Sequence, residues 1–499
     1  MNGKNATIIN SIFINNYAAI NGGGIRWGEV NGTMAYSTFT GNNAKGIGGA
    51  VYWYGANSNM SKCNFTNNCA VQGDNVYWVW TVEEFLNKYN QINDYDYVWI
   101  RNGVGTPSCT IVLNKKGIII SSESNVVFDA KGGNFHFEVT GDNVLIEKIT
   151  FRNFNFPNDR GGALQWWGHN GTLKNCNFIN NTALNGGALD WRGNNGNLTS
   201  SSFNNNVAKA NGGGVHWVSL NGTINGCTFT SNIANNNGGG VFWTNSGGSL
   251  NGCTFTSNIA NNNGGGVYWN GGNGILSSCN FSNNKANKYG GAVYWYNNNG
   301  ILTDCAFTSN TANQYGGGGI FWNGINGTLS DSIFIDNTAN DGGAIQWVGA
   351  NGTLSSSTFR GNTVSNGNGG AIDWGSSNST IMDSTFINNT SKSSGGAINC
   401  WGINSILSNS IFTNNVAPNG GAVSWYVAGA MVNCEFVNSK WIKSNNIYAH
   451  ENLEINGGKG IVDIIIDTNG TLSGTSIVVL NNETYYYPPS TNINFKDNT

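Results

Sequence analysis

Cysteines recur at one position of a short repeated pattern, two residues before a phenylalanine. Parallel side chains on stacked strands would point the same way, which suits the dihedral angle of a disulfide poorly. Serine fills the same position at Ser332, Ser357 and Ser384. No Cys-x-x-Cys pair with the spacing of zinc ligands occurs. The pattern therefore favours a packing position for a small side chain, without a metal, at Cys63, Cys176, Cys227, Cys253, Cys279, Cys305 and Cys434.

Acidic side chains are the second set with possible chemistry, because glycosidic hydrolysis needs two carboxyl groups within roughly 10 Å. Asp190 and Asp373 occupy equivalent positions of the repeat, and Asp341 precedes a Gly-Gly turn. The first two are expected to lie seven turns apart, roughly 34 Å at one strand spacing per turn. His216 and Arg26 have no partner of suitable chemistry nearby in the pattern. The spacing predicts no catalytic pair.

An aromatic row is the third set. It occupies position x of Gly-Gly-(Ala/Gly)-(Ile/Val/Leu)-x-Trp, where the other residues are mostly polar and varied, so x is expected to face solvent. Outward aromatics one turn apart could stack on sugar rings or bind a partner, or they could form a ladder that only stabilises the sheet. Serine in place of the first three should abolish adhesion under the first interpretation. The row consists of Phe242, Tyr268, Tyr294 and Phe321, with Tyr52 and Tyr77 earlier in the chain.

All these positions belong to a repeat of about 26 residues, which must be recognised before local structure is read. Phe recurs from Phe13 to Phe436 and Trp from Trp27 to Trp425, with Trp401 one residue late. The segment NGCTFTSNIANNNGGGV occurs twice without change, at 225–241 and 251–267. Short alternating runs between Asn and Gly clusters predict strands joined by turns.

Three short strands and three turns would fill one such unit, which predicts one coil of a parallel β-helix. Ile/Val/Leu, Trp, Phe and the Cys position should point inward. Stacking of equivalent residues lets Asn side chains hydrogen-bond along the axis, as they do in cross-β ladders.

The Phe repeat is interrupted once, between Phe65 and Phe151. TVEEFLNKYNQI at 81–92 has apolar residues at helical spacing. The fold class is therefore all-β: a right-handed parallel β-helix, a solenoid of ~26-residue coils, with one capping helix and a partial C-terminal β module. The expected parts are the end of a first β-helix array at 1–78, a capping helix and first strand at 79–110, the main β-helix at 111–450, and a linker with the start of a further β module at 451–499.

Composition narrows the class of protein. Aromatic residues make up 12%, which argues against a disordered chain. The net charge of -3 does not indicate the excess of basic residues that binds nucleic acid or an anionic membrane. No apolar run is long enough to span a bilayer, and no signal peptide is visible. Because the first residues already follow the repeat, the chain is expected to begin partway through a longer product.

Glycosylation sequons of the type Asn-x-Ser/Thr stand mostly as Asn-Gly-Thr at one turn of the repeat. A role in the turn is expected first and attachment of glycans second. The sequons lie at Asn31, Asn170, Asn221, Asn326, Asn351 and Asn378.

The pattern FINNTALNGGAL, which starts at Phe178, resembles the repeats of chlamydial polymorphic outer membrane proteins. The Asn-rich form with Asn-Gly-Thr-Leu, the capping helix and NVVFDAKGG is similar to adhesin-like surface proteins of methanogenic archaea. The resemblance covers 1–450. It implies a right-handed parallel β-helix of the pectin-lyase-like kind, secreted or at the cell surface, that adheres to other cells or to host or biofilm material.

We therefore expect an extracellular or cell-surface adhesin that binds a carbohydrate or a surface protein of another cell through its repetitive outer face. No catalysis, cofactor, nucleic acid or transmembrane segment is expected. One alternative is a polysaccharide-acting lyase or glycoside hydrolase of the same fold, although the Gly-His-Gly motif of polygalacturonase-like enzymes is absent. The other alternative is a purely structural stalk.

Overall fold

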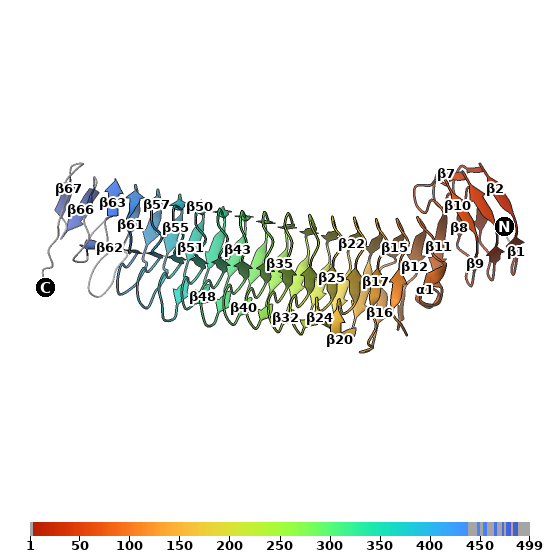
Figure 1. Cartoon of the computed structure of the whole chain (residues 1–499), viewed down its shortest axis with the longest axis horizontal. Coiled ribbons are helices and arrows are strands. Elements are labelled where there is room, and N and C mark those ends of the chain that lie inside the picture. Colours follow the sequence, from red (N-terminus) through yellow and green to blue (C-terminus); the bar gives the residue numbers. More distant parts are fainter. Residues whose placement is uncertain are drawn as a thin grey trace. The chain divides into compact units, whose positions relative to one another are not determined.

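The computed structural model is a parallel β-solenoid in each of its two units (Figure 1). Unit 1 comprises Met1–Ala208 and Val218–Cys227, and unit 2 comprises Lys209–Trp217 and Thr228–Thr499. About 17 turns of ~26 residues are present in all, which confirms the expected fold class. The structure describes residues 3–437 and the strands β62 (Ile447–Ala449), β63 (Leu453–Asn456), β64 (Ile464–Ile466), β65 (Leu472–Ser473), β66 (Ser476–Leu480) and β67 (Glu483–Tyr487).

One coil of unit 2 shows how the repeat folds. Its four strands are β38 (Ile275–Ser277), β39 (Asn280–Ser282), β40 (Lys285–Ala286) and β41 (Val293–Trp295). They pair in parallel and in register with β42 (Ile301–Thr303), β43 (Ala306–Thr308), β44 (Thr311–Ala312) and β45 (Ile320–Trp322) of the next coil. The prediction of three strands per coil was wrong by one, because the two-residue strand before the Gly-Gly turn is too short to show a period of two.

Residues that tolerate a left-handed backbone connect these strands. Ser278, Asn283 and Asn299 have φ of 51°, 55° and 58°. A short polar side chain can adopt this conformation at low cost, whereas a branched or bulky one cannot. The high Asn content is therefore explained in part by the sharp corners that each coil needs.

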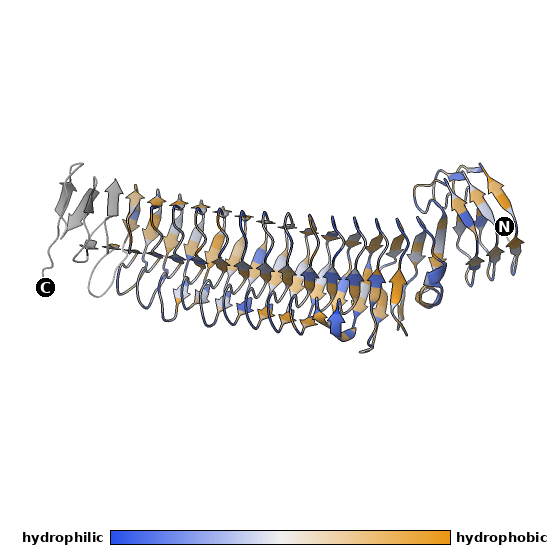
Figure 2. Cartoon of the chain, in the orientation of Figure 1, coloured by the Kyte–Doolittle hydropathy of each residue, from blue (hydrophilic) through white to orange (hydrophobic). Residues whose placement is uncertain are grey.

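Aromatic ladders fill the interior. Phe281 lies 4.8 Å from Phe255 and 4.9 Å from Phe307 between ring centroids, with near-parallel planes. Trp295 stacks in the same way on Trp269 and Trp322. These spacings equal the distance between hydrogen-bonded strands, so the stacking follows from the register. Figure 2 shows hydrophobic and hydrophilic residues alternating along the coils. The inward positions of Phe and Trp are confirmed.

A buried ladder of asparagine side chains runs beside the Phe ladder in unit 2. The Nδ2 atom of Asn284 donates to the carbonyl of Phe255 at 2.9 Å and to Oδ1 of Asn310 at 3.0 Å. Its Oδ1 accepts from the backbone N and the Nδ2 of Asn258, each at 3.0 Å. Every donor and acceptor of this side chain is thus satisfied without solvent. The predicted Asn stacking is confirmed in the ladder formed by Asn232, Asn258, Asn284, Asn310, Asn337, Asn362, Asn389 and Asn415.

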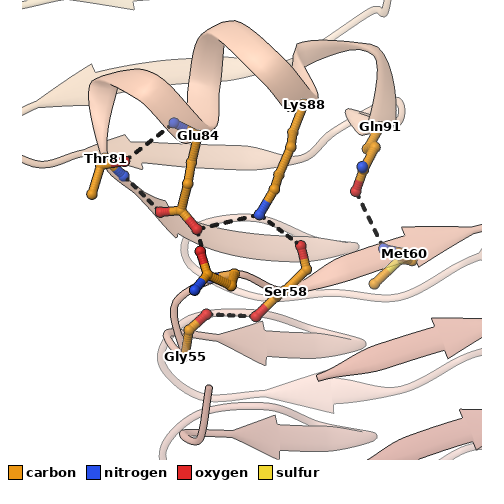
Figure 3. A network of polar contacts seen from close by, with 8 residues as sticks. Gly55, Ser58, Met60, Thr81, Glu84, Lys88 and Gln91 are labelled. Carbon is orange, nitrogen blue, oxygen red and sulfur yellow. Dashed lines mark hydrogen bonds and ion pairs between the residues drawn. The ribbon is translucent and has the colours of Figure 1, made fainter. Parts of the chain in front are cut away.

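The predicted helix is present in unit 1 as α1 (Val82–Lys88), followed by the 3₁₀ helix η1 (Tyr89–Gln91). Thr81 and Glu84 form a capping box, which satisfies free N–H groups at the helix start. Figure 3 shows that the helix also binds the preceding coil: Lys88 Nζ donates to the carbonyl of Ser58 at 2.9 Å. Burial opposes ionisation of Glu84, but hydrogen bonds from Thr81 and Asn57 and the charge of Lys88 outweigh it and lower the pKa of this carboxyl.

The strand β11 (Val76–Trp80) connects the first coils to the rest of unit 1. It pairs in parallel with β8 (Val51–Trp53) and with β12 (Tyr97–Ile100). In unit 2, β63 pairs in register with β60 (Gly429–Val432), so parallel pairing continues beyond 450. The domain boundaries stay predictions, and much of the expected module at 451–499 lies outside the described residues. Among the described residues, no helix is long and apolar enough to cross a membrane.

Candidate functional site

Position x forms one continuous row along unit 2, which we call the outer row. Its residues lie opposite one another on consecutive strands that pair in register, beginning with β29 (Val215–Trp217) and β33 (Val241–Trp243). The side chain varies from coil to coil while the inward positions on either side repeat. The outer row consists of His216, Phe242, Tyr268, Tyr294, Phe321, Gln346, Asp373, Asn399 and Ser424.

The prediction that x faces solvent was wrong for much of this row. Asp373 is 5% exposed, Asn399 3% and Ser424 0%. Alternation does turn these side chains away from the interior. However, side chains of other coils cover them, as Gln346 and Trp401 do at Asp373, and local alternation carries no information about such neighbours.

The aromatic part of the row is a ladder. Ring centroids lie 4.9 Å apart between Phe242 and Tyr268, 4.8 Å between Tyr268 and Tyr294, and 5.0 Å between Tyr294 and Phe321, with planes within 19° of parallel. Within the ladder, each ring face is therefore covered by the neighbouring ring. The ring edges and the tyrosine hydroxyls are the parts that could contact a ligand. Burial raises the pKa of Tyr268 to about 12. The use of this row as a binding face stays a prediction.

Three further tyrosines widen this aromatic part. Tyr289 stacks on Tyr315 at 4.6 Å and contacts Phe321 at 4.5 Å, and Tyr296 lies 6.3 Å from Tyr294. Tyr296 and Tyr315 are each 46% exposed. We call Tyr289, Tyr296 and Tyr315 the flanking tyrosines. Sequence reasoning missed them, although their repeat positions beside the Gly-Gly turn and after the Trp could have indicated them.

The polar part of the row centres on Asp373. Its Oδ1 accepts from Nδ2 of Asn399 at 2.8 Å and from Nε1 of Trp401 at 3.1 Å, and its Oδ2 accepts from Nε2 of Gln346 at 3.1 Å. Burial and the nearby charge of Asp341 raise the pKa of Asp373, and the three donors lower it. The net result is a pKa of about 6. This carboxyl therefore sits in a hydrogen-bonded site with no cation beside it among the described residues.

The other predicted residues make different contacts, although Asp341 is near enough to Asp373 to affect its pKa. In unit 1, Asp190 is buried and forms an ion pair with Arg192 at 2.5 Å. Arg26, also in unit 1, lies over the ring of Tyr54 at 5.5 Å. In unit 2, His216 begins the outer row with its ring 5.5 Å from Phe242. Asp341 Oδ1 accepts from the backbone N of Asn368 at 2.9 Å.

Trp401 does not occupy the inward position that the repeat predicts. Cys400 lies in register with Trp374 and Trp425, and Trp401 stands outside the coil, 43% exposed. The extra residue between the Gly-Gly turn and the Trp was the signal in the sequence. Alternation then puts Cys400 inside and Trp401 outside.

The cysteines are free thiols. The Sγ of Cys279 donates to the carbonyl of Ser277 at 3.1 Å and accepts from the backbone N of Cys253 at 3.3 Å. Ser332 uses its hydroxyl in the same way, donating to Ser330 at 2.7 Å. The inward small-residue position is confirmed for all of the predicted cysteines except Cys63, which is half-buried beside the first coils of unit 1.

We expect Cys279→Ser to lower the free energy of unfolding by less than about 1.5 kcal/mol, because serine makes the same hydrogen bonds in this position. Burial raises the pKa of the Cys279 thiol, which slows its reaction further. An Ellman titration of the native protein should modify the exposed Cys69 and Cys109 quickly and Cys279 only after denaturation. Rapid reaction of Cys279 in the native state would contradict this packing role.

The sequon asparagines line an exposed turn with φ between 52° and 58°. The Nδ2 of Asn351 donates to Oδ1 of Asn326 at 3.1 Å, and that of Asn170 donates to Asn143 at 3.2 Å. The nitrogen that a glycan would modify is thus already part of an outer Asn ladder. These contacts support the expected role in the turn, and glycosylation stays a prediction.

The Chlamydia polymorphic membrane protein repeat matches residues 278–294 and 383–400. No curated protein matches the chain. A mannuronic acid specific polysaccharide family 6 lyase from human gut microbiota is similar in structure, with a TM-score of 0.44 and 11% identity over 71% of this chain and 86% of that one.

Two further solved structures are similar at lower scores. An alginate lyase in complex with G6 has a TM-score of 0.37 and 9% identity over 82% of this chain and 90% of that one. A tailspike protein of E. coli bacteriophage HK620 in complex with a pentasaccharide has a TM-score of 0.35 and 12% identity over 89% and 74%. The chain is thus a parallel β-solenoid protein that carries repeats of the chlamydial polymorphic membrane protein type.

Proposed function

We propose that this protein is a surface-displayed adhesin that binds glycans of other cells or of biofilm material along the outer row, without catalysis. The observation that carries the proposal is the composition of that row. The positions that stack inside the coils repeat the same residues, namely Phe, Trp, Asn and Gly. Position x does not repeat one residue type: four aromatic residues are followed there by four polar ones.

The chemistry of the aromatic part of this row suits a long, hydroxyl-rich ligand. Tyr268 and Tyr294 combine apolar ring edges with hydroxyls, and the exposed flanking tyrosines Tyr296 and Tyr315 widen the contact area. Tyrosine is favoured at binding surfaces because one side chain offers apolar area and a hydrogen-bonding tip. Surface display is supported by the matching repeat, whose family name describes a membrane protein.

The test is retention of the purified protein on a glycan array and on whole cells. We expect Tyr296→Ser combined with Tyr315→Ser to weaken retention about tenfold or more, since truncating interface tyrosines commonly costs more than about 1 kcal/mol each. Both side chains are well exposed, so the fold should survive. Tyr36→Ser is the matched control, because Tyr36 is 55% exposed in unit 1. Equal retention of all three proteins would reject the aromatic part of the outer row, with its flanking tyrosines, as the adhesive face.

A polysaccharide-cleaving enzyme is the second candidate, and Asp373 favours it. A buried carboxyl with a pKa of about 6 and a second carboxyl, Asp341, close enough to affect it has the properties of a catalytic acid. Release of reducing ends should be monitored in the same wells. Release that disappears in Asp373→Asn would establish the enzyme and overturn the adhesin without catalysis.

A further inference from the structure

The coil that contains Trp401 has an exposed indole, whereas the coils on either side have a buried one. Trp374 and Trp425 in the coils on either side are buried. Cys400 fills the inward position between them, and the two indoles meet edge-on at 6.1 Å and 81° instead of stacking on a third ring. A thiol in this position buries less apolar surface than an indole. Packing therefore gives no reason for the exchange, and the exposed position of Trp401 needs another explanation.

Trp401 forms a flat platform beside the outer row. A Cβ added at Gly375 would lie 2.2 to 2.5 Å from three adjacent ring atoms of Trp401, so one face of the indole covers Gly375. Its Nε1 donates to Asp373 at 3.1 Å. With one face against the backbone and 43% of the side chain exposed, the opposite face is open to a ligand.

Buried polar atoms without partners lie under this platform. Asn399 is 3% exposed, and although its Nδ2 donates to Asp373, its Oδ1 accepts no hydrogen bond from the described residues. The same holds for Oγ of Ser424 in the next coil and for Oε1 of Gln346, two coils before Asn399. Leaving buried polar atoms unpaired is costly, and native structures keep few of them. Rotation of the Trp401 indole would uncover Asp373 and Asn399 for groups that can bond to them.

Unit 1 contains a related arrangement, in which the exposed indole belongs to the coil before the aspartate and not to the coil after it. Gln165 and Asp190 follow each other on paired strands, as Gln346 and Asp373 do in unit 2. Trp167 is 43% exposed beside them. There the guanidinium of Arg192 lies 4.9 Å above Trp167, and its Nε donates to Asp190. A planar group that stacks on the indole and donates to the carboxylate thus fits this geometry.

Unit 2 lacks that internal occupant. Gly375 stands two residues after Asp373, where Arg192 stands two residues after Asp190. No Lys or Arg forms an ion pair with Asp373 among the described residues. Asp373 and the nearby Asp341 leave the site with acidic groups only.

We propose that Trp401, Asp373 and Asn399 form a saccharide subsite that prefers an amino-bearing pyranose, accepts a neutral one and rejects a uronic acid. The apolar face of the sugar stacks on the open face of Trp401. For this, the indole rotates off Asp373. An ammonium or hydroxyl group at the ring edge then replaces the indole N–H as the donor to Asp373, and a neighbouring hydroxyl donates to Oδ1 of Asn399. A charge-assisted hydrogen bond favours the amino sugar, and repulsion between carboxylates disfavours the uronate. The subsite deepens the proposed function and rests on it.

The test uses the full chain labelled with fluorinated tryptophan, in which Trp401→Phe identifies the Trp401 signal in fluorine NMR. The probes are the hexamers of glucosamine, of neutral β-1,4-linked glucose and of galacturonic acid. We expect the Trp401 signal to shift saturably with the glucosamine hexamer, more weakly with the neutral hexamer and not with the galacturonate hexamer. No shift with any probe, or an equal shift with galacturonate, would overturn the subsite.

Two variants separate this subsite from general effects. Trp401→Ala should weaken glucosamine binding about tenfold or more, while the matched Trp167→Ala, whose ring is already covered by Arg192, should leave it unchanged. The near-isosteric Asp373→Asn should make the affinities for the glucosamine and neutral hexamers similar. Equal losses in both tryptophan variants would overturn the assignment. If the Trp401 signal does not shift but the tyrosine variants lose retention, the subsite alone is rejected. If the Trp401 signal shifts but the tyrosine variants keep retention, the aromatic part of the outer row is rejected as the adhesive face.

Discussion

Asn284→Asp is expected to destabilise unit 2 by at least about 3 kcal/mol, because the new oxygen would face two acceptors in a fully buried site. In the native protein, Nδ2 of Asn284 donates to the carbonyl of Phe255 and to Oδ1 of Asn310. An aspartate at this position loses both hydrogen bonds and places a charge in the interior. Each orphaned buried group costs about 1 to 3 kcal/mol.

The loss should depend on pH, and its sign follows from burial. An aspartate in this site has a folded-state pKa above its unfolded value, so the folded state binds more protons and stability falls as pH rises. The destabilisation should therefore be smaller near pH 4 than near pH 7. Urea midpoints at the two values measure it. Hydrogen exchange by mass spectrometry should show loss of protection in the strands next to Phe255 and Asn310, whose oxygens lose the Nδ2 donor of Asn284.

Asn299→Asp is the matched control for this substitution. Asn299 also belongs to an Asn ladder, since it donates to Asn273 and accepts from Asn326, but these contacts lie at the surface. Aspartate tolerates the left-handed backbone at this position nearly as well as asparagine does. The change in stability should stay within about 0.5 kcal/mol. Equal losses in the two variants would show that burial of the inner ladder does not matter.

Gly265→Ala is expected to lower the free energy of unfolding by about 3 kcal/mol or more. A Cβ at Gly265 would lie 2.2 Å from the carbonyl oxygen of Gly291 and 2.6 Å from the backbone N of Lys285. Both are backbone atoms of the next coil, so relief requires separation of paired strands. The thermal midpoint of the purified variant measures the loss.

Gly266→Ala, one residue later, should be tolerated within about 1 kcal/mol. Its Cβ would lie 3.0 Å from the carbonyl oxygen of Ala292 and from Cδ1 of Phe281, a tight but adjustable contact. Ala292 itself occupies the equivalent position of the next coil with 0% exposure. If the two alanine variants melt at the same temperature, close approach of coils does not explain the second glycine of the repeat.

Much of the fold could be predicted because the solenoid repeats its own environment. A residue such as Phe281 or Trp295 meets the same side chain above and below, so local alternation and the period are enough to place it. The helix at 82–88 was recognisable from the spacing of its apolar residues for a similarly local reason. The two-residue strand of each coil, for example Lys285–Ala286, was missed because its length carries no periodic signal.

The candidate site was predicted only in part. The sequence placed Phe242 to Phe321 on one row and recognised that Trp401 comes one residue late. It could not show that neighbouring rings occupy each other's faces, nor that Asp373 and Asn399 lie buried beside Trp401. Those contacts join residues 26 to 28 positions apart through side-chain directions that alternation leaves undefined.

By itself, the sequence determined the period, the inward residues and the Asn ladder, because each depends on one coil and its copies. Only the tertiary structure decided which outward residues are covered, since covering side chains come from turns and from adjacent coils whose residues differ. Arg192 closes one aspartate site and Gly375 leaves the other to Trp401. That difference arises from packing between unlike neighbours, which a repeat pattern does not encode.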